Sequence, residues 1–226
     1  MFFHPGLQSD SSFFQLEEET RRHVVTVLRM SPGEHLMLTN GKGLVATAAI
    51  VQADKKQLTV NTLGFETEPL PSRRLAIGIS LLKNATRFEW MLEKVTEIGI
   101  TEIFPLVTER TERQHFRKER FGQILVSASL QSQRFHFPLL HDPLKLEQLV
   151  STSFFNHKYI AHCMDGHREK LVGVQGDGML LIGPEGDFTT EEVALAMKNG
   201  YIPVSLGETR LRTETAGIVG AVLLRG

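Results

Sequence analysis

The stretches LIGPEGDF, at residues 181–188, and SLGETRLRTETA, at residues 205–216, decide the fold of this chain. Each stretch follows an apolar run that predicts a strand, and one short helical segment separates the two. In open parallel sheets, ligands bind outside the carboxyl ends of the strands. We therefore expect two glycine-bearing loops to emerge side by side at that edge and to form a pocket.

Strands and helices alternate from about residue 73 onward. The helix before the last strand opens with a capping box formed by Thr189 and Glu192, and an earlier helix ends at Gly99, which suits a carboxyl-terminal cap. Such alternation predicts an α/β domain with a mostly parallel sheet covered by helices. The predicted strands are 75–82, 103–107, 159–162, 179–182 and 201–206, and the predicted helices are 88–98, 118–132, 189–199 and 216–224.

The first 65 or so residues are predicted to form a small, mostly β unit. An amphipathic helix is predicted over 16–29, strands over 36–39 and 44–51, and a further strand over 58–63. Asn40 and Gly41 join the first two strands as a hairpin, because both residues tolerate positive φ. The segment 66–72 contains two prolines and reads as a linker. The predicted domains are therefore 1–68 and 73–226.

Composition limits the classes of function. The chain has 226 residues, 41% hydrophobic content and a formal net charge of -1, which argue for a globular protein whose nucleic-acid contacts are local. One cysteine, Cys163, excludes an internal disulfide, and the histidines show no metal-binding spacing. No apolar run reaches the roughly 20 residues that span a bilayer, and no signal peptide is evident. We expect a cytoplasmic protein with no membrane association and no metal.

Neither glycine-bearing loop matches a common phosphate-binding motif. Residues 183–188 lack the Lys-Ser/Thr ending of a P-loop, and no G-x-G-x-x-G follows the first strand of the α/β domain. Nucleotide hydrolysis and dinucleotide redox chemistry are therefore disfavoured. Taken singly, each loop is equally well read as a turn, and the charges of Glu208, Arg210, Arg212 and Glu214 as a solvated face. The pairing of the loops favours binding.

The stretch from Leu181 to Ala216 resembles the SPOUT class of S-adenosylmethionine-dependent methyltransferases. Within that class it is similar to the RsmE family, which methylates N3 of a uridine in small-subunit ribosomal RNA. The family pattern resembles GPEGG followed by LG-x-x-ILR-x-ETA, and this chain has GPEGD at 183–187 and LGETRLRTETA at 206–216. It departs from the family at Asp187, where a second glycine is usual, and at Leu130, where glutamate is expected. The resemblance extends to Arg22-His23 and Val27-Leu28-Arg29 at the amino end and, upstream of the loops, to Lys83, Arg87, Glu89, Lys94, Glu97, Gly99, Pro105, Glu109, Arg110, Gln131, Ser132 and Arg134.

The resemblance implies an amino-terminal PUA-like β-barrel that binds RNA, followed by a SPOUT α/β domain with a trefoil knot. It also implies a homodimer, S-adenosylmethionine as cofactor, and small-subunit ribosomal RNA or the assembled small subunit as partner. The stretch 110–120, which includes Arg113, is rich in basic residues but also contains glutamates. Its simplest interpretation is therefore a solvated surface of mixed charge. The cofactor residues implied are Ile182, Gly183, Glu185, Gly186, Ser205, Leu206, Gly207 and Leu211, and the expected RNA contacts are Arg21, Arg22, His23, Arg29, Arg110 and Arg134.

The chemistry of uridine N3 assigns roles to two charged residues. N3 becomes a nucleophile only as its imide proton leaves, so negative charge develops on the uracil oxygens. We expect Arg212 to stabilise that charge and Glu214 to act as base or to orient Arg212. An ordinary glutamate, with a pKa of about 4.3, is poorly matched to such a proton, and an ion pair that stiffens the loop is the alternative role. Alternative functions are methylation of a ribose 2'-hydroxyl or another base, and non-catalytic RNA binding or ribosome assembly.

Overall fold

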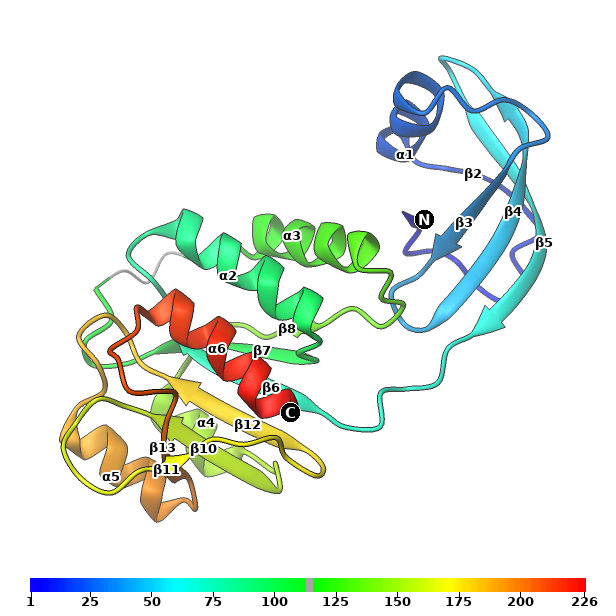
Figure 1. Ribbon diagram of the computed structural model, residues 1–226. Helices are drawn as coiled ribbons and strands as arrows, with labels where there is room; N and C mark the ends of the chain where they lie inside the picture. Colours follow the sequence, from blue (N-terminus) through cyan, green and yellow to red (C-terminus); the bar gives the residue numbers. More distant parts are fainter. Residues whose placement is uncertain (113–115) are drawn as a thin grey trace. The chain divides into compact units, whose positions relative to one another are not determined.

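The computed structural model describes residues 1–112 and 116–226, so Arg113 and His115 lie outside the described residues (Figure 1). The chain divides into two compact units. The first comprises Met1–Pro71 together with Ser129–Phe137, and the second comprises Ser72–Ala128 together with Pro138–Gly226. The chain therefore returns to the first unit after residue 128. The predicted division into 1–68 and 73–226 did not include this return.

The first unit is built on a five-stranded sheet in the order β1-β3-β4-β5-β2. Its strands β3, β4 and β5 form an antiparallel meander, whereas β1 pairs with β3 in parallel. Leu38, Leu58 and Val60 are fully buried in the core of this PUA-like domain. The strands are β1 (Phe2–Phe3), β2 (Phe13–Gln15), β3 (His35–Thr39), β4 (Leu44–Ala53) and β5 (Leu58–Thr67).

The predicted hairpin between β3 and β4 is confirmed. Gly41 and Gly43 adopt φ angles of +71° and +92°. The Asn40 side-chain oxygen accepts hydrogen bonds from the backbone N–H groups of Lys42 and Leu44, at 2.8 and 3.2 Å. The turn residues thus close the loop with their own side-chain and backbone groups.

The predicted helix over 16–29 is only partly present. The chain forms α1 (Glu18–Arg22) and then a π-helical turn, η1 (His23–Val27). Val24 is fully buried, but Val27 is 66% exposed and Leu28 is 49% exposed. The prediction of one apolar helical face was wrong, because the change from i→i+4 to i→i+5 bonding alters which side chains share a face. The predicted linker is also shorter, since β5 continues through Thr67.

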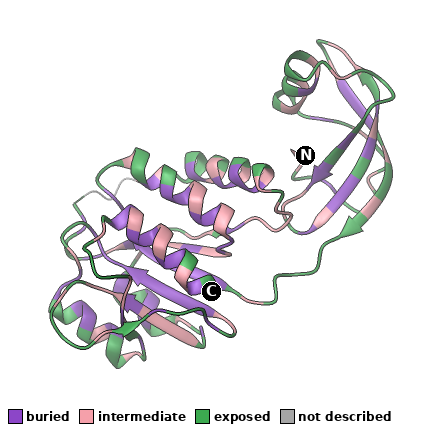
Figure 2. Ribbon diagram, in the orientation of Figure 1, coloured by how far each residue is buried: buried purple, intermediate pink, exposed green. Residues whose placement is uncertain are grey.

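The second unit confirms the predicted parallel sheet. Its strand order is β11-β13-β10-β12-β6-β7-β8, with β9 pairing to β7, and each pairing is parallel. The central strands β6 and β12 are buried along their whole length (Figure 2). Strands buried on both faces read as continuous apolar runs, which is why the sequence revealed them. The strands are β6 (Leu75–Ser80), β7 (Glu102–Val107), β8 (Leu139–Leu140), β9 (Leu144–Lys145), β10 (His157–Ala161), β11 (Glu169–Lys170), β12 (Gly178–Ile182) and β13 (Ile202–Ser205).

Helices cover both faces of this sheet, as Figure 1 shows. On one face α2 (Ala85–Ile98), α3 (Lys118–Gln131) and α6 (Thr213–Arg225) pack with Ile77, Ile79 and Leu180 of the central strands. On the other face α4 (Leu146–Thr152) and α5 (Thr190–Lys198) pack with Ala76 and Leu181. Helix α4 was not predicted from the sequence. Among the described residues, no helix is long and apolar enough to cross a membrane.

Helix α6 packs against the sheet, and its carboxyl end contacts the segment 171–174. A Cβ atom at Gly220 would lie 2.4 Å from a methyl group of Leu180 in β12, so α6 approaches the sheet closely. Towards its end, Val174 N donates a hydrogen bond to Leu224 O at 3.3 Å. The end of the last helix thus contacts an earlier part of the chain. The trefoil knot that the resemblance implies stays a prediction.

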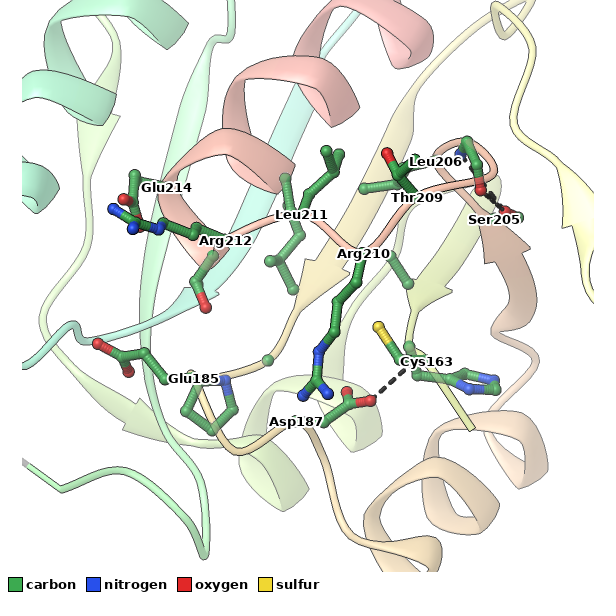
Figure 3. Close-up of a pocket in the computed structure, with 18 of the residues that line it drawn as sticks. Cys163, Glu185, Asp187, Ser205, Leu206, Thr209, Arg210, Leu211, Arg212 and Glu214 are labelled. Carbon is green, nitrogen blue, oxygen red and sulfur yellow. Dashed lines mark hydrogen bonds between the residues drawn. The ribbon is translucent and has the colours of Figure 1, made fainter. Parts of the chain in front are cut away.

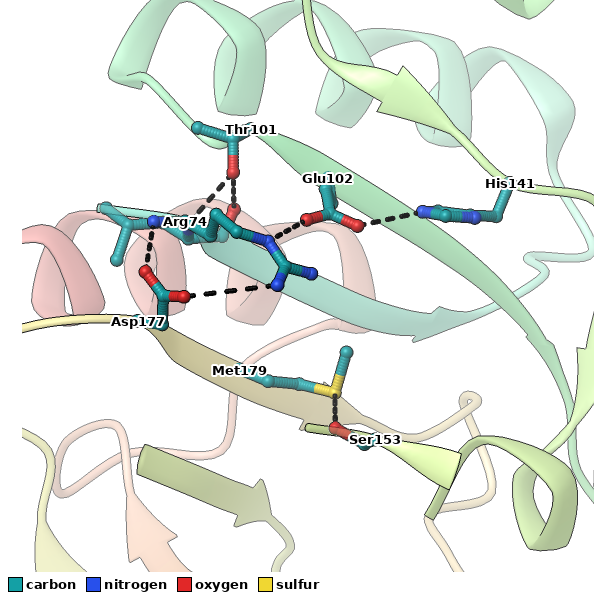
Figure 4. Close-up of polar contacts among 8 residues, drawn as sticks. Arg74, Thr101, Glu102, His141, Ser153, Asp177 and Met179 are labelled. Carbon is teal, nitrogen blue, oxygen red and sulfur yellow. Dashed lines mark hydrogen bonds and ion pairs between the residues drawn. The ribbon is translucent and has the colours of Figure 1, made fainter. Parts of the chain in front are cut away.

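A polar network connects the amino ends of the central strands (Figure 4). Arg74 Nε donates to Glu102 Oε1 at 2.7 Å, and the Asp177 carboxylate accepts from the backbone N–H of Arg74 at 2.7 Å. His141 Nε2 lies 3.0 Å from Glu102 Oε2. The network ties β6 and β7 to the turn before β12 at the edge opposite the loops of 181–188 and 205–216.

The capping box predicted for α5 is confirmed and allows a stability prediction. Thr189 Oγ1 accepts from Glu192 N at 3.2 Å, and Glu192 Oε2 accepts from Thr189 N at 2.9 Å. Replacing Thr189 by alanine removes one of these bonds, and we expect the free energy of unfolding to fall by about 1 kcal/mol. Urea denaturation measures the change. An unchanged midpoint would show that the cap does not stabilise the helix.

Candidate active site

A pocket of about 490 Å³ opens at the carboxyl ends of β10, β12 and β13 (Figure 3). The loop after β12 and the loop after β13 form most of its wall, as expected from their glycine-bearing sequences. Nine of the ten cofactor and catalytic candidates line the pocket, and Gly186 does not. Lining residues from the candidate set are Ile182, Gly183, Glu185, Ser205, Leu206, Gly207, Leu211, Arg212 and Glu214.

The first loop, residues 183–188, is held by side chains on both of its sides. Asp187 adopts φ +64°, and its carboxylate accepts from Cys163 N at 2.7 Å and from Phe188 N at 2.8 Å. On the other side, Arg110 donates to Gly186 O at 2.7 Å. A Cβ atom on Gly186 would lie 3.3 Å from the Arg110 side chain, so this glycine packs against Arg110 and lies outside the pocket lining. Arg110 braces the loop, and its expected contact with RNA stays a prediction.

Gly183 and Gly207 are required for different physical reasons. A Cβ atom on Gly183 would lie 3.0 Å from the backbone nitrogen of Phe188, because the loop folds back over it. Gly207 has open space around it but adopts φ +147°, which side-chain-bearing residues rarely tolerate. The structure gives loop packing for the first and backbone conformation for the second.

Gly183→Ala tests the packing of the first loop. Because the added methyl group meets backbone atoms rather than a mobile side chain, we expect the loop to shift and the affinity for S-adenosylmethionine to fall by about tenfold or more. Calorimetric titration measures this affinity. Gly122→Ala is the control, since that glycine lies in α3 outside the pocket lining, a Cβ atom there would have nothing within 4 Å, and its φ is not in the left-handed region. Equal affinities in the two variants would contradict the prediction.

Glu214 and Arg212 stand at the start of α6 in different environments. Glu214 is 6% exposed, and its Oε1 lies 3.5 Å from Nε of Arg87 on α2. Arg212 is exposed, and within residues 1–112 and 116–226 its guanidinium has no hydrogen-bond or ion-pair partner. The expected orientation of Arg212 by Glu214 therefore has no contact in this structure. Glu214 is instead paired with Arg87, which sequence reasoning had not assigned to the site.

Sequence reasoning also missed the loop after β10, which supplies one side of the pocket. His162, Cys163 and Arg168 come from this segment, and Arg168 donates to His162 O at 2.7 Å. His162 Nδ1 is buried and, among the described residues, has no hydrogen-bond partner. Burial lowers the pKa of His162, an effect that Asp187 opposes. The strand predicted over 159–162 could have indicated this segment, because its carboxyl end faces the same edge of the sheet.

The amino-terminal RNA candidates lie in the first unit. Arg21 is engaged, because it donates to Lys55 O and lies 3.5 Å from the Glu18 carboxylate. Arg22, His23 and Arg29 are exposed on or just after α1 and η1. Arg134 belongs to the same compact unit through the returning segment 129–137. Their contacts with RNA stay predictions. In the described ranges, no group of three or more His, Cys, Asp or Glu residues is placed to hold a metal ion.

Comparison with known proteins gives the site its context. Residues 68–225 match the model of an RNA methyltransferase domain, and residues 16–63 match that of an RNA methyltransferase PUA domain. The chain is 30% identical over 215 residues to ribosomal RNA small subunit methyltransferase E of Mycobacterium bovis, a match that covers 88% of this chain and 82% of that relative. The protein belongs to the ribosomal RNA small subunit methyltransferase E family. It is therefore an RNA methyltransferase.

Solved structures of similar proteins agree with this family. A crystal structure from Porphyromonas gingivalis, described as a "probable rRNA-methyltransferase", superposes with a TM-score of 0.90 at 38% identity and covers 97% of this chain and 94% of that chain. Ribosomal RNA small subunit methyltransferase E of Neisseria gonorrhoeae, solved with bound S-adenosylmethionine, gives a TM-score of 0.83 at 27% identity and covers 97% of this chain and 94% of that chain. Within the methyltransferase family, the α/β domain described above is therefore the SPOUT domain.

Proposed function

We propose that this methyltransferase transfers a methyl group from S-adenosylmethionine to N3 of a uridine in small-subunit ribosomal RNA. One observation carries the proposal: Arg212, exposed and without a hydrogen-bond or ion-pair partner among the described residues, and the buried Glu214 both line the pocket made by the two glycine-bearing loops. A similar protein, from Neisseria gonorrhoeae, binds S-adenosylmethionine. The family name of the relatives supports small-subunit ribosomal RNA as the substrate.

The pocket fits the proposed cofactor in size and lining. Its volume of about 490 Å³ lies within the range of small-molecule sites. Ile182, Leu206 and Leu211 provide apolar walls for an adenine ring, and Ser205 and Gly207 line the pocket beside them. Bound S-adenosylmethionine supplies an electrophilic methyl group on a sulfonium. The protein therefore has to bind the donor, align its methyl group with the acceptor atom and stabilise the charge that develops during transfer.

Arg212 and Glu214 act on the uridine. As the imide proton leaves N3, negative charge spreads to the uracil oxygens, and the guanidinium of Arg212 stabilises this charge. No contact of Arg212 within the described residues has to break first. The Glu214 carboxylate takes the N3 proton, while Arg87, whose Nε lies 3.5 Å from Oε1, holds the group in place. Glu214 thus carries out the deprotonation, and Arg212 stabilises the negative charge.

The proposed substrate contacts and assembly extend beyond the pocket. Arg22, His23 and Arg29 contribute phosphate contacts, which position RNA without reading its bases and weaken as salt rises. A homodimer is supported by large apolar side chains left exposed on the helices of one face, Trp90 at 47% on α2 and Val222 at 53% on α6. We place the reaction in the cytoplasm, where ribosomal subunits are the substrate.

Transfer of a labelled methyl group tests the proposed activity. The full-length protein is incubated with labelled S-adenosylmethionine and small ribosomal subunits that lack the modification, or with the RNA extracted from them. Large-subunit RNA serves as the matched control substrate. We expect incorporation into small-subunit RNA alone. Binding of S-adenosylmethionine without transfer to any ribosomal RNA would instead favour a non-catalytic role.

A further inference from the structure

The pocket carries charged groups at two separate ends. Figure 3 shows Arg212, Glu214 and Glu185 at one end and Arg210, Asp187 and Cys163 at the other, with Leu211 between them. The first end holds the residues proposed to act on uridine. The second end has no role in that chemistry, although it contributes both an acidic and a basic side chain to the pocket lining.

Asp187 occupies a backbone conformation that is unfavourable for a residue with a Cβ atom, although aspartate tolerates it better than most residues do. Its φ of +64° lies in the left-handed region, which disfavours residues with a Cβ atom by roughly 1–2 kcal/mol. The loop holds the residue there through bonds from Cys163 N and Phe188 N, one to each carboxylate oxygen. Each oxygen of an ionised carboxylate can accept a further hydrogen bond. Asp187 thus presents a fixed negative charge that retains capacity for a cationic ligand group.

Arg210 faces the same end of the pocket from the second loop. It is exposed, and its guanidinium has no hydrogen-bond or ion-pair partner in the part of the chain that the structure describes. Figure 3 shows its side chain running from the second loop toward the first loop and Asp187. The two side chains form no ion pair with each other among the described residues. A negative and a positive group therefore line one end of the pocket from opposite loops, and neither neutralises the other by direct contact.

We infer that Arg210 and Asp187 bind the amino-acid end of the methyl donor, Arg210 at the α-carboxylate and Asp187 at the α-ammonium group. This inference rests on the proposed function. A guanidinium suits a carboxylate because its planar donors match the two oxygens. A zwitterion carries both charges on neighbouring atoms and so needs complementary groups of both signs. Leu206, Leu211 and Ile182 remain for the adenosine part.

An RNA phosphate is the rival ligand for Arg210. A phosphodiester carries negative charge only, and the Asp187 carboxylate at the same end of the pocket repels it. Asp187 cannot move away easily, because two backbone N–H groups hold its side chain. The presence of both signs of charge therefore favours the amino-acid end of the donor over the RNA backbone.

Two thioether compounds related to the donor distinguish binding of its amino-acid end from binding of its adenosine part. S-adenosylhomocysteine has the amino-acid end and 5'-methylthioadenosine lacks it, and neither carries the sulfonium charge. Calorimetric titration of the full-length protein gives the ratio of their affinities. We expect Arg210→Met to weaken S-adenosylhomocysteine binding by about tenfold or more, the equivalent of one charge-assisted bond, and to leave methylthioadenosine binding within about twofold. Asp187→Asn should change the ratio in the same direction.

Arg212→Met is the matched control, since it removes the same kind of side chain from the same loop, and it should leave the affinity ratio unchanged. Melting temperatures of all variants verify that they fold. An unchanged ratio in Arg210→Met would overturn the inference. So would a variant that binds S-adenosylhomocysteine normally but binds RNA more weakly with a reduced salt dependence, because Arg210 would then contact phosphate. Failure of the unaltered protein to bind either thioether would instead overturn the proposed function.

Discussion

Replacing Arg212 by alanine is expected to lower the single-turnover rate of methyl transfer by about 100- to 1,000-fold, the usual effect of removing a group that stabilises transition-state charge. The affinity for S-adenosylmethionine should stay within about twofold. The guanidinium of Arg212 has no partner among the described residues, so its removal breaks no contact of the fold. Rapid-quench measurement of methyl incorporation at saturating donor and RNA gives this rate.

Arg212→Lys provides the control for charge. Lysine keeps the positive charge but cannot present two parallel donors, so we expect an intermediate rate. Equal rates for the alanine variant and the unaltered enzyme would remove Arg212 from the mechanism. A loss of rate that tracks a lower melting temperature would also contradict the account, because it would assign Arg212 a structural role.

Replacing Phe188 by alanine is expected to lower the free energy of unfolding by about 3–5 kcal/mol, as deletion of a buried aromatic ring commonly does. Phe188 is fully buried in the core between the sheet and α4 and α5. Its ring also lies against Gly183, where a Cβ atom would be 3.1 Å from Phe188 Cδ2. The variant should therefore lose both stability and the shape of the first loop. Urea denaturation followed by circular dichroism measures the stability.

Phe154→Ala is the matched control within the same compact unit. Phe154 is 88% exposed, so its loss should change the free energy of unfolding by no more than about 0.5 kcal/mol. Similar losses in the two variants would show that burial of Phe188 does not stabilise the domain.

The parallel sheet, the hairpin at Asn40 and Gly41, and the capping box at Thr189 were predictable because local patterns specify them. Buried strands such as β12 read as unbroken apolar runs, and caps and turns depend on residues a few positions apart. The prediction of an amphipathic helix over 16–29 was wrong because it relied on local apolar spacing alone. That spacing suits an α-helix, but the chain changes to π-helical bonding at His23.

Contacts between distant segments could not be read from the sequence. The Arg87–Glu214 pair joins α2 to α6, and the Arg110 contact with Gly186 joins the segment after β7 to the first loop. The return of 129–137 to the first unit is likewise a property of tertiary packing. The sequence did place the two glycine-bearing loops at one pocket, because parallel strands bring their carboxyl ends to the same edge. Which charged residues pair there depends on helices that arrive from elsewhere.

Nucleoside mass spectrometry tests the central claim most directly. Unmodified small subunits are reacted with the protein and S-adenosylmethionine, and the RNA is then digested to nucleosides and compared with methylated standards. We expect one new product, 3-methyluridine, which should accumulate about 100- to 1,000-fold more slowly when Arg212→Ala replaces the unaltered protein. A 2'-O-methylated nucleoside or a methyl group on another base would contradict the claim.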